Sequence, residues 1–266
     1  MSYNQTIKNQ LFLLKLNGAL EGFEKQIHQQ MYHELSYEER LTDLLQSEIQ
    51  YKKRKKVENL LKKSNLKYKT ASLTDVDLRA ERKINISLFN LLLDCQWMNE
   101  GKNLIITGST GCGKTWLSCA FGNQAIMKNL SVLFTRINYL TTEISISRAN
   151  GSYLSYLEKL AKNQVIILDD LFVSKMSLND EYELLEIIES VIQKCSLILT
   201  SQYAVKDWYS QFNNPTLADA ILDRIVHNAY RIELFATQSK RKNENPMEKF
   251  LNDKEKLVIQ NENAKL

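Results

Sequence analysis

Residues 108–115 read GSTGCGKT, and they directly follow the mostly apolar run NLIIT at residues 103–107. The octet matches the spacing Gly-x4-Gly-Lys-Thr in full, in which glycines let backbone N–H groups turn inward and surround phosphates. Its placement after a strand and before a helix adds the positive end of that helix. The stretch predicts a nucleotide-triphosphate site, where Lys114 reaches the β- and γ-phosphates and the Thr115 hydroxyl ligates magnesium. The residues predicted to contact the nucleotide are Gly108, Ser109, Thr110, Gly111, Cys112, Gly113, Lys114, Thr115 and Trp116.

The composition is that of a protein with an ordinary packed core. The 266-residue chain is 44% hydrophobic, and its eight Gly and two Pro argue against long disordered linkers. Its four cysteines form no CxxC pair and have no nearby His, which argues against a zinc set and favours free thiols in a reducing cytosol. The polar start MSYNQTIKNQ lacks signal-peptide character, and no apolar stretch approaches the ~20 residues of a membrane helix. We therefore expect a cytoplasmic protein with no membrane partner.

A second motif, VIILDD at residues 165–170, is an apolar run that ends in two carboxylates. Ligands of α/β sheets bind at the carboxyl ends of the strands, so these side chains are expected beside the phosphates. Asp169 is predicted to hold magnesium through water, and Asp170 to orient the attacking water. The motif is weak alone and becomes strong when it is paired with the phosphate loop.

Two later stretches add polar candidates. LILTSQ at residues 197–202 ends a predicted strand in polar groups, and a side chain there can bond the γ-phosphate or the water; an ordinary strand-ending turn is the alternative. In LADAILDRIVH at residues 217–227 the apolar positions bury one helix face and point Arg224, with Asp223, outward. Arg224 is either part of a surface ion pair of little energy or a residue that reaches a neighbouring molecule's nucleotide and stabilises transition-state charge.

Short apolar runs alternate with helical patterns through most of the chain, which predicts an α/β fold with a parallel five-stranded sheet covered on both faces. These runs occupy residues 104–107, 131–135, 165–168, 197–200 and 230–234.

The first third of the chain has the pattern of helices. Ser36 and Glu39 are spaced as a capping box at the start of one of them. Apolar residues then recur at helical spacing and are expected to pack on the preceding amphipathic helix, which contains Leu16, Leu20, Phe23 and Ile27. The apolar residues in question are Leu41, Leu44, Leu45 and Ile49. A linker is expected at residues 64–77, where the periodicity fades and Ser, Thr and Asp collect.

A basic stretch lies at the end of this helical region. Residues 52–69 contain nine Lys or Arg and one Glu, a local net charge of +8. Such a surface suits the phosphate backbone of a nucleic acid, although a run of this kind can also be only a solvated helix face. The contact residues predicted at its start are Lys52, Lys53 and Arg54.

Several of these stretches together resemble the IstB-like helper ATPases encoded beside insertion-sequence transposases. That family lies within the AAA+ class, close to the DnaC-type helicase loaders and replication initiators. The matching segments are ITGSTGCGKTWLSCAFG, SVLF, ISRANGSY, VIILDD, LILTSQ and NPTLADAILDRIVHNAYRIEL, which span about residues 79–242. The resemblance implies an AAA+ P-loop fold preceded by a small all-helical N-terminal domain. Its domains would be residues 1–72 for DNA or partner binding, 73–242 for the AAA+ ATPase domain and 243–266 for a mobile polar tail.

The resemblance also implies roles for single residues. Residues 108–115 would form the Walker A motif, and Asp169 with Asp170 would form the Walker B motif. Gln202 would be the first sensor residue, Arg224 would be the arginine finger, and Arg241 would be the second sensor residue. Arg148, in ISRANGSY, becomes a second candidate for DNA contact.

The function implied is that of an ATP-dependent DNA-binding helper of transposition. It would need ATP and Mg²⁺, assemble as a homo-oligomer on double-stranded DNA and regulate the transposase encoded by the same element. Asp170 stands where many AAA+ proteins have Glu, and no room follows Arg241 for a full helical lid, so slow hydrolysis that acts as a timer is expected. The alternative is a DnaC-like replicative helicase loader. A small-molecule kinase is disfavoured because no basic lid insertion stands out.

Overall fold

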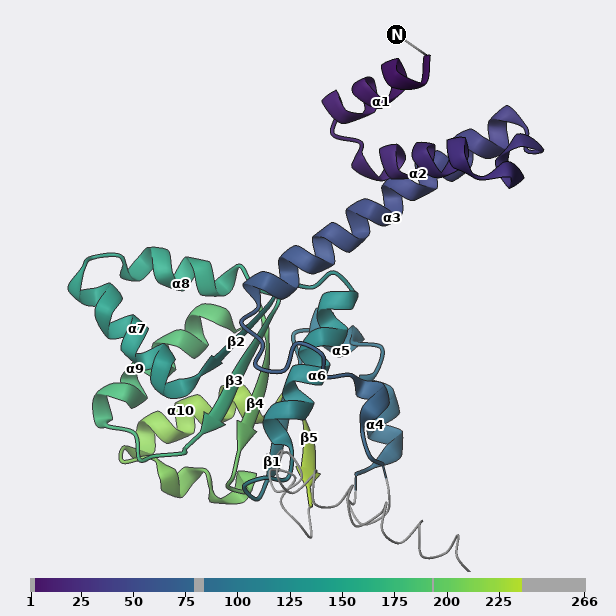
Figure 1. Cartoon of the computed structure of the whole chain (residues 1–266). Helices are drawn as coiled ribbons and strands as arrows, with labels where there is room; N and C mark the ends of the chain where they lie inside the picture. Colours follow the sequence, from purple (N-terminus) through teal and green to yellow (C-terminus); the bar gives the residue numbers. More distant parts are fainter. Residues whose placement is uncertain (1–2, 79–83, 193, 236–266) are drawn as a thin grey trace, which may run out of the picture. The chain divides into compact units, whose positions relative to one another are not determined.

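The computed structural model describes residues 3–78, 84–192 and 194–235, and its elements are labelled in Figure 1. The chain divides into two compact units, Met1–Lys62 and Lys63–Leu266. Its principal helices are α1 (Tyr3–Leu13), α2 (Asn17–His28), α3 (Tyr37–Lys63), α4 (Ile86–Leu92), α5 (Gln96–Asn99), α6 (Lys114–Met127), α7 (Ile137–Ala149), α8 (Tyr153–Ala161), α9 (Leu178–Val191) and α10 (Pro215–Val226).

A five-stranded parallel sheet forms the centre of the second unit, in the order β2-β3-β4-β1-β5. The prediction of the sheet is confirmed, because each apolar run became a strand. The strands are β1 (Asn103–Gly108), β2 (Val132–Arg136), β3 (Val165–Leu171), β4 (Ser196–Ser201) and β5 (Ala229–Leu234). The carboxyl ends of β1, β3 and β4 lie next to one another, and this places the phosphate loop beside the two carboxylates.

Alternate residues of the strands face different helices. Ile166 and Leu168 of β3 belong to a core cluster with residues of α7, α9 and α10. Ile167, between them, lies against α6, where a Cβ on Gly122 would meet Ile167 Cδ1 at 2.9 Å. Figure 1 shows α6 and α7 with α9 on different sides of the sheet. Burial of both faces is the reason for the continuous apolar runs.

The segment predicted as a linker instead packs on the sheet unit. Leu66, Ala71 and Leu73 are buried, and Phe134 N donates to Ser64 O at 2.7 Å. Asn123 on α6 donates to two carbonyls of the same segment, those of residues 68 and 71, at 3.1 and 2.8 Å. Partners for its backbone let this weakly periodic segment pack with only one short 3-10 helix, Leu73–Asp75. The division between the compact units therefore falls after Lys62, ahead of the predicted boundary at residue 72.

The first unit is built on a close approach of α2 and α3. The capping box is present, since Glu39 N donates to Ser36 Oγ at 3.3 Å and Ser36 N donates to Glu39 Oε2 at 2.8 Å. The predicted apolar seam was wrong at three of its four positions, since Leu41, Leu45 and Ile49 are 40–55% exposed. Leu44 is half-buried, and its Cα would lie 3.8 Å from a Cβ on Gly22 of α2.

The contact between α2 and α3 runs instead through small residues. A Cβ on Gly18 would lie 2.4 Å from Tyr51 Cβ and 2.6 Å from the carbonyl oxygen of Ser47. The buried Glu48 carboxylate accepts hydrogen bonds from Gly18 N at 2.7 Å and Ala19 N at 3.0 Å. Small side chains bring the two backbones close enough for a carboxylate of α3 to satisfy the first N–H groups of α2. This leaves Leu41, Leu45 and Ile49 of α3 exposed.

Candidate nucleotide site

The phosphate loop has the backbone that its glycines predict. Gly108, Gly111 and Gly113 have φ values of +146°, +83° and +100°, a region that other residues rarely adopt. A Cβ on Gly108 would also lie 2.3 Å from Leu234 O on the neighbouring strand β5. Lys114 Nζ donates to the carbonyls of Gly108 at 2.8 Å and residue 109 at 3.0 Å. The ammonium group is therefore held within the loop that binds phosphates.

The two carboxylates are set by a bulge at the end of β3. Leu168 pairs with Leu199 and Leu171 pairs with Ser201, so β3 carries one residue more than β4 over this interval. Within the bulge Asp170 has φ +61°, and Asp169 is fully buried. The bulge thus gives two consecutive carboxylates different surroundings.

Asp169 is the centre of the site's hydrogen bonds. Thr115 Oγ1 donates to Asp169 Oδ1 at 2.8 Å, and Thr200 Oγ1 donates to the same oxygen at 2.7 Å. The second oxygen, Oδ2, is buried and has no hydrogen-bond partner among the described residues. Burial is the main cause that raises the pKa of this carboxyl, and the nearby Asp170 charge raises it further.

This arrangement fits magnesium. Hydroxyl and carboxylate oxygens are the ligands that Mg²⁺ prefers, and a buried carboxylate oxygen without a partner is available to a hydrated ion. Thr115 and Asp169 would hold it, as the sequence suggested, and when bound it would neutralise charge on the phosphates.

The end of β4 and the residue that follows it contribute one residue that was predicted and one that was not. Thr110 Oγ1 donates to Gln202 Oε1 at 3.4 Å, so the predicted sensor side chain lies against the phosphate loop. Thr200, two residues earlier, contacts Asp169 directly and accepts a hydrogen bond from Asp170 N at 2.9 Å. Thr200 belongs to the same polar strand end, LILTSQ, that the sequence singled out, and this could have drawn attention to it.

A second residue that sequence reasoning missed is Arg136, the last residue of β2. Its Nε lies 3.8 Å from Asp169 Oδ2 and 3.8 Å from Asp170 Oδ2. A lone arginine at the end of a predicted strand gives no signal by itself. Only the order of the strands places it beside the two carboxylates.

Arg224 lies on α10 and is bound on its own molecule. Its Nη1 donates to Ala220 O at 2.7 Å and its Nη2 to Glu189 Oε1 on α9 at 2.9 Å. Asp223, which the sequence offered as the ion-pair partner of Arg224, lies instead beside His227, with 3.2 Å between Asp223 Oδ1 and His227 Nε2. The α10 start is held by the buried Glu181, which accepts from the backbone N–H groups of residues 213 and 214.

The other predicted residues are spread over the two units. Trp116 is half-buried in the first turn of α6. Arg148, on α7, stacks on Tyr153 and forms ion pairs with Glu183 and Glu186 of α9, so carboxylates already compensate its charge. Its contact with DNA stays a prediction. Arg241 and the predicted tail 243–266 lie outside the described residues.

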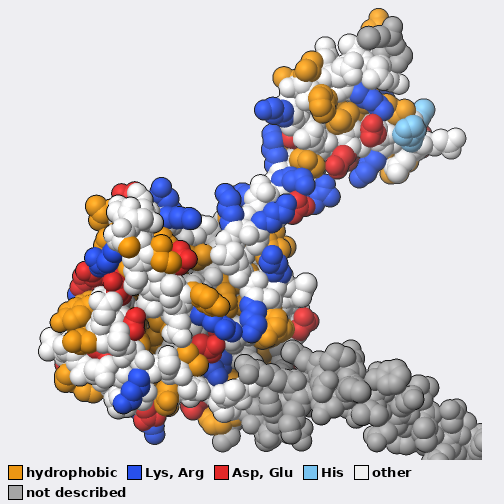
Figure 2. All heavy atoms as spheres, turned by 60° about the vertical axis from the view of Figure 1, so that its left-hand side comes forward, with side chains coloured by type: hydrophobic (Ala, Val, Ile, Leu, Met, Phe, Trp, Pro, Cys, Tyr) orange, Lys and Arg blue, Asp and Glu red, His pale blue; other side chains and the backbone are white. Residues whose placement is uncertain are grey.

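Lys52, Lys53 and Arg54 lie on the exposed second half of α3, where Figure 2 shows Lys and Arg side chains crowded along the helix. Lys52 pairs with the buried Glu48 at 3.3 Å, and Arg54 with Glu21 at 3.3 Å. No carboxylate within the described part of the chain pairs with Lys53. The charge of this stretch is therefore only partly compensated.

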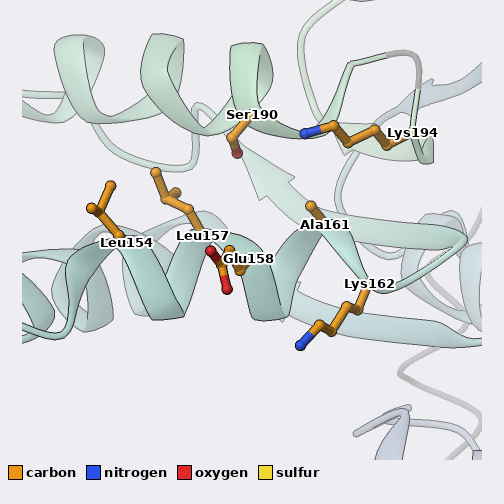
Figure 3. A pocket seen from close by; sticks show the side chains of 7 residues that line it. All are labelled: Leu154, Leu157, Glu158, Ala161, Lys162, Ser190 and Lys194. Atoms are coloured by element: carbon orange, nitrogen blue, oxygen red, sulfur yellow. The ribbon is translucent and has the colours of Figure 1, made fainter.

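A shallow groove lies away from these residues, between α8 and the end of α9 (Figure 3). Leu154 and Leu157 lie along its α8 side, and Glu158, Lys162 and Lys194 stand at its edges. It contains none of the predicted nucleotide contacts.

Comparison with known proteins decides the family. The family described as IstB-like ATP binding protein matches residues 9–246. The chain belongs to the IstB-like family. This IstB-like chain is 36% identical over 236 residues to a putative insertion-sequence ATP-binding protein of Sinorhizobium fredii, covering 89% of this chain and 96% of that protein. It is 38% identical over 194 residues to a putative insertion-sequence ATP-binding protein of Pseudomonas fluorescens, covering 73% of this chain and 84% of that protein.

Solved structures show the same AAA+ fold in the IstB-like chain. It resembles DnaI with a TM-score of 0.52 and 25% identity, over 67% of this chain and 94% of that one. The DnaC helicase loader matches with a TM-score of 0.50 and 21% identity, over 63% of this chain and 98% of that one, and this likeness concerns the fold alone. The protein is thus an ATP-binding AAA+ ATPase. No helix within the described ranges is long and apolar enough to cross a membrane.

Proposed function

We propose that this ATPase is a helper of DNA transposition that assembles on double-stranded target DNA and regulates the transposase of its own element. The observation that carries the proposal is that an ATP site and a basic helix occur in different compact units of one IstB-like chain. A nucleotide signal in one unit is then available to control a DNA-binding surface that belongs largely to the other.

The chemistry at the site follows from its side chains. Lys114 places a positive charge at the phosphates, and Asp169 with Thr115 would hold magnesium, as argued above. Asp170 orients the attacking water. Arg224, on the exposed side of α10, completes the site of a neighbouring copy, because its contacts among the described residues are with Glu189 and Ala220 and not with its own phosphate loop. Asp170 replaces the longer Glu of many relatives in the AAA+ class, and a shorter reach to the water gives slow hydrolysis, suited to a timer.

A helicase loader is the second candidate, favoured by the likeness to DnaI. The two functions differ in the nucleic acid that the protein prefers. A transposition helper binds duplex DNA and its transposase, whereas a loader prefers single strands and a replicative helicase. The relatives from insertion sequences share more identity and more of the chain, and they favour the first function.

Lys114→Ala provides the test. This variant is expected to lose ATP binding in a calorimetric titration, because Lys114 supplies the mobile positive charge of the phosphate loop. It should then remain unassembled on duplex DNA when sedimentation is measured with ATP, whereas the parent protein forms larger complexes. Lys128→Ala, beyond the end of the same helix, is the matched control and should behave like the parent. Equal assembly of parent and Lys114→Ala on duplex DNA, or assembly of the parent on single strands alone, would contradict the proposal.

A further inference from the structure

The pairing of strands β2 and β3 places Arg136 beside the proposed metal site. It is the last residue of β2 and is the register partner of Asp169 in the parallel ladder between β2 and β3. Register partners of adjacent strands project to the same side of a sheet, so the two side chains lie next to each other. The resulting separation of Nε from Asp169 Oδ2 is 3.8 Å.

The oxygen that Arg136 faces is the one that lacks other partners. Asp169 Oδ1 accepts two hydroxyl hydrogen bonds, whereas Oδ2 accepts none from the described residues although it is buried. A buried carboxylate oxygen needs a cation or donors in order to stay ionised. At 3.8 Å the guanidinium supplies charge rather than a hydrogen bond. The charge of Oδ2 is therefore partly compensated, and the oxygen remains available to another ligand.

Arg136 changes the net charge of the site. Asp169 and Asp170 bring two negative charges, while Lys114 and Arg136 bring two positive ones. The site is balanced before nucleotide binds, and a divalent cation alone would add two positive charges. A triphosphate adds several negative charges, after which the cation restores the balance. Without Arg136 the same side chains would carry a net negative charge and attract the cation by themselves.

We propose that Arg136 is a resident counter-cation of the metal site, which competes with a divalent cation for Asp169 and Asp170 and so makes metal binding depend on nucleotide. The inference rests on the proposed assignment of Thr115 and Asp169 as the metal site. The Arg136 side chain is 41% exposed, so it has room to move toward solvent when Mg²⁺ and ATP bind together. Arg136 also precedes α7 as its N-cap residue, which links the metal site to that helix.

The test measures divalent cation binding to the full chain without nucleotide. Mn²⁺, which prefers the same oxygen ligands as Mg²⁺, is titrated and its free concentration is followed by electron paramagnetic resonance. Arg136→Gln should bind Mn²⁺ roughly three- to tenfold more tightly than the parent, since one partly screened charge is removed. Its affinity for ATP in EDTA should change by no more than about twofold.

Two matched variants control for charge and position. Arg136→Lys keeps the charge and should retain the parent affinity for Mn²⁺. Arg231→Gln removes an arginine from β5, the strand at the other edge of the sheet, and should also match the parent. Circular dichroism establishes that each variant is folded. If Arg136→Gln does not fold, Arg136→Met, which keeps the aliphatic length, takes its place in each measurement.

Three outcomes would overturn the proposal. Unchanged Mn²⁺ affinity in Arg136→Gln would show that Arg136 does not compete with the cation. Loss of ATP affinity in EDTA, with unchanged Mn²⁺ affinity, would make Arg136 a phosphate ligand instead. Tight Mn²⁺ binding that persists in Arg136→Gln with Asp169→Asn would place the ion elsewhere and remove the metal assignment too. By contrast, if Asp169→Asn alone weakens Mg–ATP binding while Arg136→Gln changes nothing, the proposed ATP chemistry stands without this inference.

Discussion

Thr200 shows how a single hydroxyl can organise the carboxylates of the site. It is fully buried, donates to Asp169 Oδ1 and accepts from Asp170 N. It therefore holds the Asp169 carboxylate, proposed to bind the metal, and the main chain of Asp170, proposed to orient the water, at the same time. Because both partners are polar groups at the bulge of β3, removal of the hydroxyl leaves each of them short of one hydrogen bond.

Thr200→Val is expected to lower both stability and turnover. The buried groups that lose a partner should lower the free energy of unfolding by about 1–3 kcal/mol. Loss of orientation around Asp169 should reduce ATP hydrolysis about 10- to 100-fold, as for other residues that position metal ligands. Urea denaturation and phosphate release at saturating Mg–ATP measure the two effects. Thr200→Ser keeps the hydroxyl and is the control; equal activity of the Val and Ser variants would exclude this role.

At the scale of elements, small departures from regular structure position the functional side chains. The bulge in β3 separates the surroundings of Asp169 and Asp170. Glu181 of α9 holds the two residues that directly precede α10, the helix that carries Arg224. In the first unit, Gly18 and Gly22 let α2 approach α3, and this contact determines which side of α3 is exposed.

Gly18→Val should separate α2 from α3. The new side chain would meet Tyr51, Ser47 and Glu48 at under 3 Å, and overpacking of this kind costs about 1–3 kcal/mol. Hydrogen–deuterium exchange of the full chain should become faster in α2 and the first half of α3, and remain unchanged in the phosphate loop. Gln50→Ala, on the exposed side of α3, is the control. Unchanged exchange in α2 would show that the close contact does not hold the unit together.

At the scale of the whole molecule, the proposed function requires communication between copies of the chain and with DNA. The ATP site belongs to the unit Lys63–Leu266, and the first part of the basic stretch, through Lys62, belongs to the unit Met1–Lys62. Arg224 lies on α10 with its guanidinium partly exposed. These surfaces offer two separate tests, one of DNA binding and one of assembly.

Charge reversal at Lys52, Lys53 and Arg54 should weaken binding to duplex DNA and flatten its dependence on salt. Each phosphate contact that is lost removes about 0.9 from the slope of log K against log salt. Fluorescence anisotropy over a series of salt concentrations measures this slope. Reversal of Lys159, Lys162 and Lys194, which are exposed on the sheet unit, changes the net charge equally and is the control. Identical slopes in both triple variants would mean that the basic stretch is only a solvated face.

Arg224→Ala should bind ATP nearly normally and lose hydrolysis by roughly 10³ or more, the usual contribution of an arginine supplied in trans. Mixing it with Lys114→Ala should restore part of the activity, because one copy then supplies an intact pocket and the other an intact arginine. Phosphate release from the separate and mixed proteins measures the effect, with Arg231→Ala as the control. A fully active Arg224→Ala protein that stays monomeric with ATP and DNA would exclude the composite site.

The sequence by itself determined the sheet, the phosphate loop and the carboxylate pair. These features depend on local patterns: continuous apolar runs for strands buried on both faces, and glycines at backbone angles that other residues avoid. Only the tertiary structure placed Arg136 beside Asp169, because that contact depends on which strands are neighbours and in what register. It likewise decided that α3 packs on α2 through small residues and not through Leu41 and Leu45, because periodicity shows that a helix has an apolar face but not what that face meets.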